Sequence, residues 1–150
     1  MPKNIIVDTS CLVLLEKIDE LDVLQKLFSN IVITPVVAGE FGSDLPKFIE
    51  VKEAEDKKYQ NLLEMSVDPG EASAIALALE LGGLVILDDR KARKLALELK
   101  LDFTGTLGIL VGAARSGYIS SFEEILKRIK QTNFHLSEEL EHKLLDLLNE

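Results

Sequence analysis

The chain has no tryptophan, a single cysteine and few aromatic residues, which account for 5% of its 150 positions. One cysteine excludes a disulfide within the chain, and with only His135 and His142 as further partners it is a poor basis for a zinc site. We therefore expect Cys11 to be a small core residue. Because aromatic residues are scarce, the core has to be built from Leu, Ile, Val and Ala.

No hydrophobic run approaches the length that a membrane-spanning helix needs. The first residues lead directly into a strand pattern and do not resemble a signal peptide. We therefore expect a cytoplasmic protein with no membrane partner. Hydrophobic residues make up 47% of the chain, and its length suits one core, so we expect a single globular domain over residues 1–150.

Positive charge is in the minority, since 17 basic residues face 26 acidic ones and the net charge is −9. This balance argues against non-specific binding of nucleic acid by the whole surface, although it does not exclude a nucleic-acid substrate. Basic residues are concentrated at Arg90, Lys91, Arg93 and Lys94. That run is either a contact for a polyanion or a solvated helix face.

Helix and strand patterns alternate along the chain, which is typical of an α/β protein. We expect strands at residues 4–7, 31–33 and 84–87 and around 103, and helices at 9–17, 21–28, 35–42, 70–81, 90–99, 107–115, after 121 and after 137. Residues 43–67 are the least regular; a short strand at 48–51 and a helix at 57–65 are expected there, as an excursion from the sheet. Strands separated by helices need crossover connections, which favours a parallel sheet.

Five carboxylates occupy positions at which burial is costly unless they bind something. Asp8 follows the apolar run 5–7, and Asp88 and Asp89 follow the run 84–87. Parallel pairing brings the carboxyl ends of these strands to one edge of the sheet, where sites form in such folds. Glu71 opens a helix that is about 16 Å long, and the strand that follows it is about 13 Å long. If the helix packs antiparallel to that strand, the start of the helix and the end of the strand lie at the same edge, so Glu71 should lie near Asp88 and Asp89.

Glu40 is the fifth acid, and it shares a helical stripe with Val36, Val37 and Phe41, so it should face the interior or its rim. Each acid also has an ordinary structural explanation. Asp8 and one of the Asp88–Asp89 pair could cap helices, Glu71 could pair with the cap at Asp68, and Glu40 could form a salt bridge with a lysine. Their coincidence at one edge favours a shared site.

Several carboxylates within about 5 Å of one another cannot all stay ionised unless positive charge is present. Oxygen ligands alone suit Mg²⁺ or Mn²⁺. Such ions activate water and stabilise the charge that develops during hydrolysis of a phosphodiester. The acids therefore indicate a metal-dependent hydrolase.

These residues, in this order, resemble the PIN-domain family, including its VapC-like toxins and related ribonucleases. The matching segments are Val7-Asp8-Thr9-Ser10, Pro35 to Glu40, Gly70-Glu71-Ala72, Leu87-Asp88-Asp89-Arg90 and Thr104-Gly105-Thr106-Leu107-Gly108. The resemblance covers essentially the whole chain. It implies a three-layer α/β fold in which helices flank a central parallel sheet.

The resemblance also implies a site and partners. Asp8, Glu40, Glu71 and Asp89 would be the catalytic acids that bind Mg²⁺ or Mn²⁺, with Asp88 adjacent and the hydroxyl of Ser10 supporting Asp8. Which of Asp88 and Asp89 is the ligand stays open. The implied substrate is RNA, and relatives in toxin–antitoxin pairs suggest an antitoxin protein and a homodimer as partners.

We carry three functional hypotheses from the sequence. The first is an endoribonuclease in which Arg90, Lys91, Arg93 or Arg115 holds the RNA backbone. In it, the helix beginning near Thr106 either receives a phosphate at its N–H groups or is simply capped. The second is a phosphatase similar to the haloacid-dehalogenase group, with Asp8 as nucleophile, although Ser10 stands where that group has a second Asp. The third is a catalytically silent PIN-like module that binds a partner.

Overall fold

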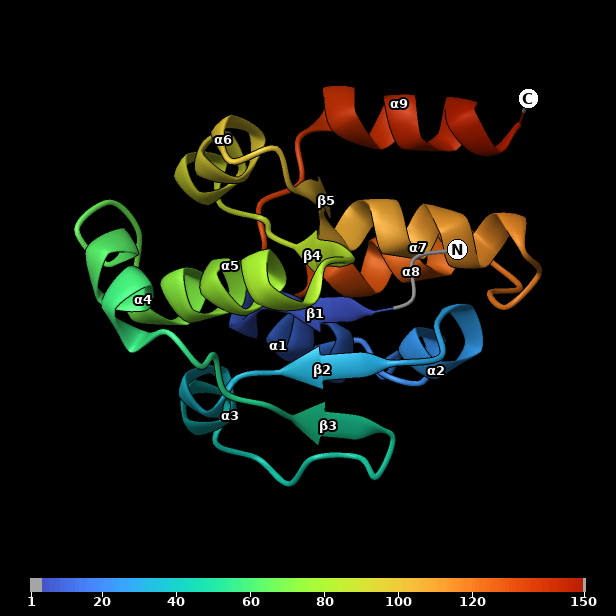
Figure 1. Cartoon of the computed structure of the whole chain (residues 1–150). Helices are drawn as coiled ribbons and strands as arrows, with labels where there is room; N and C mark the ends of the chain where they lie inside the picture. Colours follow the sequence, from blue (N-terminus) through green and yellow to red (C-terminus); the bar gives the residue numbers. More distant parts are fainter. Residues whose placement is uncertain (1–3, 150) are drawn as a thin grey trace.

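The computed structural model of the chain describes residues 4–149 and contains a five-stranded parallel sheet with the strand order β3-β2-β1-β4-β5 (Figure 1). The strands are β1 (Ile5–Val7), β2 (Ile31–Ile33), β3 (Ile49–Val51), β4 (Leu84–Ile86) and β5 (Asp102–Thr104). All four neighbouring pairs are parallel, so the expected parallel sheet is confirmed. The central strand β1 is buried on both faces, which explains its uninterrupted apolar sequence.

Helices cover both faces of this sheet and make a three-layer α/β fold, as expected. They are α1 (Thr9–Lys17), α2 (Val23–Leu27), α3 (Pro35–Phe41), α4 (Lys57–Leu63), α5 (Pro69–Leu81), α6 (Arg90–Glu98), α7 (Thr106–Arg115), α8 (Phe122–Lys130) and α9 (Glu138–Leu148). Helices α4, α5 and α6 supply the apolar cluster on one face, and α1, α2, α3, α7, α8 and α9 supply the cluster on the other. Successive residues of β1 alternate between the two clusters.

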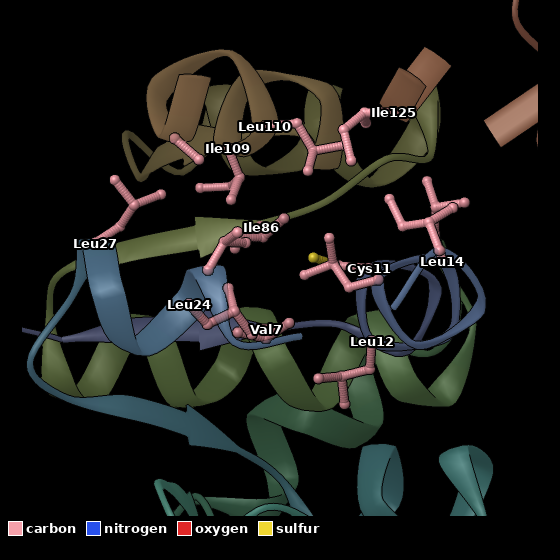
Figure 2. Close-up of a cluster of buried hydrophobic side chains, with 14 of the residues drawn as sticks. Val7, Cys11, Leu12, Leu14, Leu24, Leu27, Ile86, Ile109, Leu110 and Ile125 are labelled. Atoms are coloured by element: carbon pink, nitrogen blue, oxygen red, sulfur yellow. The ribbon is translucent and has the colours of Figure 1, made fainter. Parts of the chain in front are cut away.

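The larger cluster lies between the sheet and helices α1, α2, α7 and α8 (Figure 2). Cys11 belongs to this cluster. Its side chain is fully buried, and its thiol is free. Burial raises the pKa of its thiol. The prediction that Cys11 is a core residue is confirmed.

Helix α5 is the most deeply buried helix near the sheet, because every residue from Gly70 to Ala78 is buried. Its sequence is small or apolar on all sides, which predicted this location. Asp68 caps its first turn, Pro69 follows as the first helical residue, and the chain leaves the helix at Gly82 with a φ of 72°. The cap fixes the first turn of α5, and this turn lies beside the residues that follow β1 and β4.

One expectation is confirmed and a related one needs correction. The strand expected at 48–51 is present as β3, and the helix expected at 57–65 is present as α4. The segment 43–67 is not an excursion from the sheet, because β3 within it pairs with β2 and forms an edge of the sheet.

No helix among residues 4–149 combines the length and the apolar character that crossing a bilayer requires.

Candidate active site

One cavity of about 660 Å³ lies where β1 and β4 end and where helices α1, α5 and α6 begin. We call it the acidic pocket and define it by its lining residues: Asp8, Thr9, Ser10, Glu40, Asp68, Glu71, Asp88 and Asp89. Six of these are carboxylates, and none of the six takes part in an ion pair within residues 4–149. The structure thus brings all five acids singled out in the sequence to one place.

The sheet register explains this convergence. Val7 of β1 pairs with Ile86 of β4, so both strands end at the same level. The backbone N–H of Asp8 then donates to the Ile86 carbonyl at 3.3 Å. The residues that follow, Asp8 on one strand and Asp88 on the other, leave the sheet side by side.

Asp8 is the most constrained of the acids. Its side chain is 4% exposed, and within the described part of the chain its buried Oδ1 has no hydrogen-bond partner. Burial raises the pKa of Asp8 from 3.8 to about 7; the Thr9 backbone N–H opposes this shift, and the charges of Asp68, Glu40 and Asp88 add to it. Asp8 precedes α1 but its side chain does not cap that helix. A buried carboxyl group in this state requires a proton or a cation.

Glu71 and Asp68 cap helix α5 together. The Glu71 backbone N–H donates to Asp68 Oδ1 at 2.8 Å, and the Asp68 N–H donates to Glu71 Oε1 at 3.2 Å. Glu71 is 7% exposed, and burial raises its pKa from 4.5 to about 7, with further increases from the charges of Asp68, Asp89 and Asp8. The capping explanation for Glu71 is therefore correct. It involves only Oε1, and the residue lines the acidic pocket as well.

Glu40 reaches the pocket from the last turn of α3. It is exposed, and its Oε1 accepts a hydrogen bond of 2.5 Å from Thr9 Oγ1. A Cβ atom on Gly70 would collide with this carboxylate, so the bare backbone at Gly70 is what lets Glu40 approach the start of α5. Of the two expected positions, the interior or its rim, Glu40 takes the rim, and Val37 and Phe41 are the buried residues of α3.

Asp88 and Asp89 have different surroundings despite being adjacent. Asp88 Oδ1 accepts from the Thr106 N–H at 2.8 Å, and its Oδ2 accepts from Thr106 Oγ1 at 2.6 Å and from Ser10 Oγ at 3.1 Å. Asp89 is the N-cap of α6, and its Oδ2 accepts from the Ala92 N–H at 3.0 Å. Asp88 therefore has both oxygens engaged, whereas Asp89 uses one.

These contacts correct one prediction and decide between two alternatives. Ser10 was expected to support Asp8, but its hydroxyl donates to Asp88. The helix start at Thr106 was expected either to receive a phosphate or to be capped; Thr106 is fully buried and both of its donors are bound to Asp88, so the start is capped. The capping carboxylate follows β4 and lies 18 positions earlier in the chain, so the local sequence does not reveal this contact.

The basic residues separate into two groups. Arg90, Lys91 and Arg93 are exposed on α6, directly after Asp89, and Arg93 stacks 5.3 Å from the centre of the Phe103 ring. Arg115 instead lies at the opposite end of α7 from the pocket, and its Nη2 donates to the Leu147 carbonyl at 2.8 Å. Arg115 therefore anchors the end of α9, and its expected contact with RNA at the site is not supported by its location.

Sequence reasoning missed two residues of the acidic pocket, Asp68 and Thr9. Asp68 was recognised only as a helix start, although its spacing of three residues from Glu71 could have placed it at the same edge. Thr9 follows Asp8 directly. Its role, holding Glu40, depends on a contact across 31 positions of the chain.

The donor chemistry of the acidic pocket fits a hard divalent cation. The side chains offer oxygen atoms only, and the unpartnered Oδ1 of Asp8 lies among them. As they stand in residues 4–149, no three acidic, histidine or cysteine side chains are close enough together to hold an ion. Hydrogen bonds from Thr9, Thr106 and Ala92 hold Glu40, Asp88 and Asp89 at the walls, so ion binding requires rotation of side chains toward Asp8.

Comparison with known families agrees with this geometry. The family model DUF3368, described as a PIN domain, matches residues 4–150. The chain belongs to this PIN-domain family, as the sequence resemblance implied. PIN domains are generally nucleases and typically bind divalent metals, so the fold is nuclease-like. A search of the curated proteins gave no match.

Proposed function

We propose that the protein is a Mg²⁺- or Mn²⁺-dependent endoribonuclease that hydrolyses phosphodiester bonds of RNA at the acidic pocket. The observation that carries this proposal is the state of Asp8, whose buried Oδ1 has no partner within residues 4–149 and which shares one pocket with five further carboxylates. A cation would satisfy that oxygen and balance its neighbours. Membership of the PIN-domain family supports a nucleic acid as the substrate.

Four side chains would hold the ion: Asp8, Glu40, Glu71 and Asp89. Of the latter three, each engages only one carboxylate oxygen in the hydrogen bonds of the described residues and retains the other. When bound, the ion lowers the pKa of a coordinated water and stabilises the charge that develops on the phosphate. No side chain is required as a covalent nucleophile.

In this proposal Asp89 is the ligand and Asp88 has a positioning role. Its three hydrogen bonds, two from Thr106 and one from Ser10, fix the turn between β4 and α6. Asp89 projects from that turn into the pocket. Asp88 therefore acts on the site through the orientation of its neighbour.

The exposed cations of α6 provide a means of holding RNA next to the pocket. Arg90 and Lys91 begin this helix directly after the N-cap Asp89, so their charges lie at the rim that a phosphate backbone would cross. Contacts of this kind fix the strand without reading its sequence. They also offset the repulsion that an acidic pocket exerts on a polyanion.

The phosphatase alternative is less consistent with the geometry. A nucleophilic Asp8 would have to reach a phosphorus atom from a position that is 4% exposed. The residue two positions later is Ser10, whose hydroxyl is engaged by Asp88, and not the second Asp that this alternative requires. Failure to trap an acyl-phosphate on the wild-type protein would exclude it.

Titration with Mn²⁺ is the direct test. We expect the wild-type protein to bind Mn²⁺, Asp8→Asn and Asp89→Asn to bind it at least tenfold more weakly, and RNA cleavage to disappear in chelator and in both variants. Asp102→Asn is the matched control, since Asp102 is an exposed acid at the start of β5. Equal Mn²⁺ binding by all four proteins would instead support the catalytically silent module.

An antitoxin partner and a homodimer are further proposals that rest on the family resemblance. Light scattering would measure the mass of the isolated protein, and co-expression with the product of the neighbouring reading frame would test the antitoxin. A monomer that copurifies with no such product would contradict both.

A further inference from the structure

A second polar cavity, of about 610 Å³, lies at the end of α1 farther from the acidic pocket. We call it the distal cavity. Its polar lining consists of Lys17, Asp19, Arg128, Gln131, Thr132 and Asn133, contributed by the ends of α1 and α8 and by the segments after them. The proposed metal site does not account for this cavity.

A third, smaller cavity lies along α1 between these two. It has a volume of about 290 Å³, and it shares Ser10 with the acidic pocket and shares Lys17 and Asn133 with the distal cavity. Val13, Leu14 and Phe134 provide apolar surface along it. Ser10 and Lys17 are seven residues apart on one helix, which places them about 10 Å apart. At about 3.4 Å per nucleotide step of a stacked strand, this path accommodates about three nucleotides.

Lys17 is the principal cation of the distal cavity. Its ammonium group donates to Asn133 Oδ1 at 3.0 Å, and within residues 4–149 it forms no ion pair. It is exposed at the last position of α1, beside the carboxylate of Asp19. A lysine of this kind is suited to a phosphate, because its remaining donors and its charge are unused within that part of the chain.

Arg128 has a more restricted position. Its Nη1 donates to the Ile18 carbonyl at 3.1 Å and lies 3.6 Å from Glu20, while its Nε lies 3.7 Å from Glu124. These contacts fix the guanidinium plane and reduce its net charge. Such a plane is suited to stacking on a base more than to holding a phosphate.

The remaining groups of the distal cavity are of the kind that read bases. Gln131 and Asn133 carry amide groups, which pair with the edges of unstacked bases. Thr132 is less available, since its hydroxyl donates to the Ile129 carbonyl at 2.6 Å and accepts from the Phe134 N–H at 3.1 Å. The volume of the cavity is in the range of small-molecule sites, which is the size that one nucleotide needs.

We propose that the distal cavity binds one nucleotide of a single-stranded substrate, about three nucleotides from the bond that the acidic pocket cleaves. Lys17 contacts a phosphate, Arg128 stacks on the base, and Gln131 and Asn133 contact its edge. The single strand follows α1 through the intermediate cavity, past Ser10, Val13 and Lys17. The inference rests on the proposed function only for the identity of the substrate, and binding can be measured without cleavage.

The test measures fluorescence anisotropy of a labelled twelve-nucleotide RNA without divalent metal. We expect Lys17→Ala to weaken binding about five- to tenfold and to reduce the slope of log K against log salt by about one. Lys26→Ala is the matched control, since Lys26 is an exposed lysine on α2 that pairs with Asp22 at 3.5 Å, and it should leave affinity unchanged. Within residues 4–149 the Lys17 ammonium group has one hydrogen bond, to Asn133, and thermal melting would verify that the variant folds.

Cleavage then separates this inference from the proposed function. Lys17→Ala should lower kcat/KM for the twelve-nucleotide RNA and leave kcat/KM for a dinucleotide, which cannot reach the distal cavity, unchanged. Gln131→Ala should change the base preference at one position of the longer RNA. If the wild-type protein cleaves no RNA but Lys17→Ala still weakens binding, the nuclease proposal fails and the distal site stands. If Lys17→Ala and Lys26→Ala bind the long RNA equally well, the distal site is overturned.

Discussion

Asp88 holds Thr106 by two hydrogen bonds, one from the backbone N–H at 2.8 Å and one from the hydroxyl at 2.6 Å. The contact joins the end of β4 to the first residue of α7, and Gly105 permits it, because a Cβ there would come within 3.0 Å of Asp88 Oδ1. Both oxygens of Asp88 thus accept hydrogen bonds, whereas within residues 4–149 Asp89 accepts one, through Oδ2. Two adjacent and identical residues therefore have different surroundings in the fold.

Replacing Thr106 with valine tests this contact. The substitution keeps the shape of the side chain and removes the hydroxyl, so a buried, charge-assisted hydrogen bond is lost while the backbone one remains. We expect the free energy of unfolding in urea to fall by about 1–3 kcal/mol. Ser10→Ala, which removes an exposed and longer bond to the same carboxylate, should lower it by less. If both variants lost the same free energy of unfolding, the Thr106 hydroxyl would not make the stronger contact with Asp88.

The raised pKa values of Asp8 and Glu71 predict how stability depends on pH without metal. Both are raised from ordinary values, 3.8 and 4.5, to about 7. At a pH between the ordinary and the raised pKa values, the two carboxyl groups are protonated in the folded protein but ionised in the unfolded chain. The free energy of unfolding therefore falls as pH rises, by up to about 1.4 kcal/mol per pH unit for each group. This contribution is complete below pH 4 and is lost as pH passes through 7.

Unfolding in urea between pH 4 and 8, in the presence of chelator, would measure this slope. Asp8→Asn should reduce it, since an asparagine does not titrate, whereas Asp102→Asn should not. Added Mn²⁺ should restore stability above pH 7 in the wild-type protein, because a cation binds the ionised form. The same slope in the Asp8→Asn and wild-type proteins would show that Asp8 titrates at its ordinary value.

Gly70→Ala should separate stability from function. The new methyl group would occupy the space of the Glu40 carboxylate, which must then move away from the start of α5. Alanine has the higher helix propensity, so we expect the melting temperature to stay the same or rise, and affinity for Mn²⁺ to fall three- to tenfold. Gly39→Ala is the control, because a Cβ at Gly39 meets no atom within 4 Å. Similar Mn²⁺ affinities in both variants would argue against a role for Glu40.

Arg115 and Lys91 should respond differently to replacement by alanine. Arg115 holds the Leu147 carbonyl, so its loss should lower the free energy of unfolding by about 1 kcal/mol and leave RNA affinity unchanged. Lys91 is exposed at the start of α6, so its loss should leave stability unchanged and reduce the salt slope of RNA binding by about one. Urea unfolding and anisotropy titrations measure the two effects. A loss of RNA affinity in Arg115→Ala would contradict the structural role.

Several features of the candidate site could be predicted from the sequence because they depend on local chemistry. The apolar run before Asp8, the helix of small residues after Glu71 and the run before Asp88 each define an element and its end. Parallel pairing then places those ends at one edge. The capping box at Asp68 and the buried Cys11 follow from similarly local rules.

Other features depend on contacts between distant residues. Ser10 and Asp88 are 78 positions apart, and Thr9 and Glu40 are 31 apart, so neither hydrogen bond has a signature in the adjacent sequence. The position of Arg115 was misjudged for the same reason, since helix α7 carries it away from the pocket toward α9. The strand β3 was expected from the sequence, but its place at the edge of the sheet depends on its pairing with β2.

The order of apolar and acidic residues along the chain was enough to determine a parallel α/β sheet with carboxylates at its carboxyl edge, because side-chain burial and strand direction follow from local periodicity. The tertiary structure alone decided which carboxylate oxygens accept hydrogen bonds, that Arg115 lies away from the acidic pocket and that a distal cavity forms at the other end of α1. Those properties depend on which distant donors reach each side chain, and only the packing of helices on the sheet determines that.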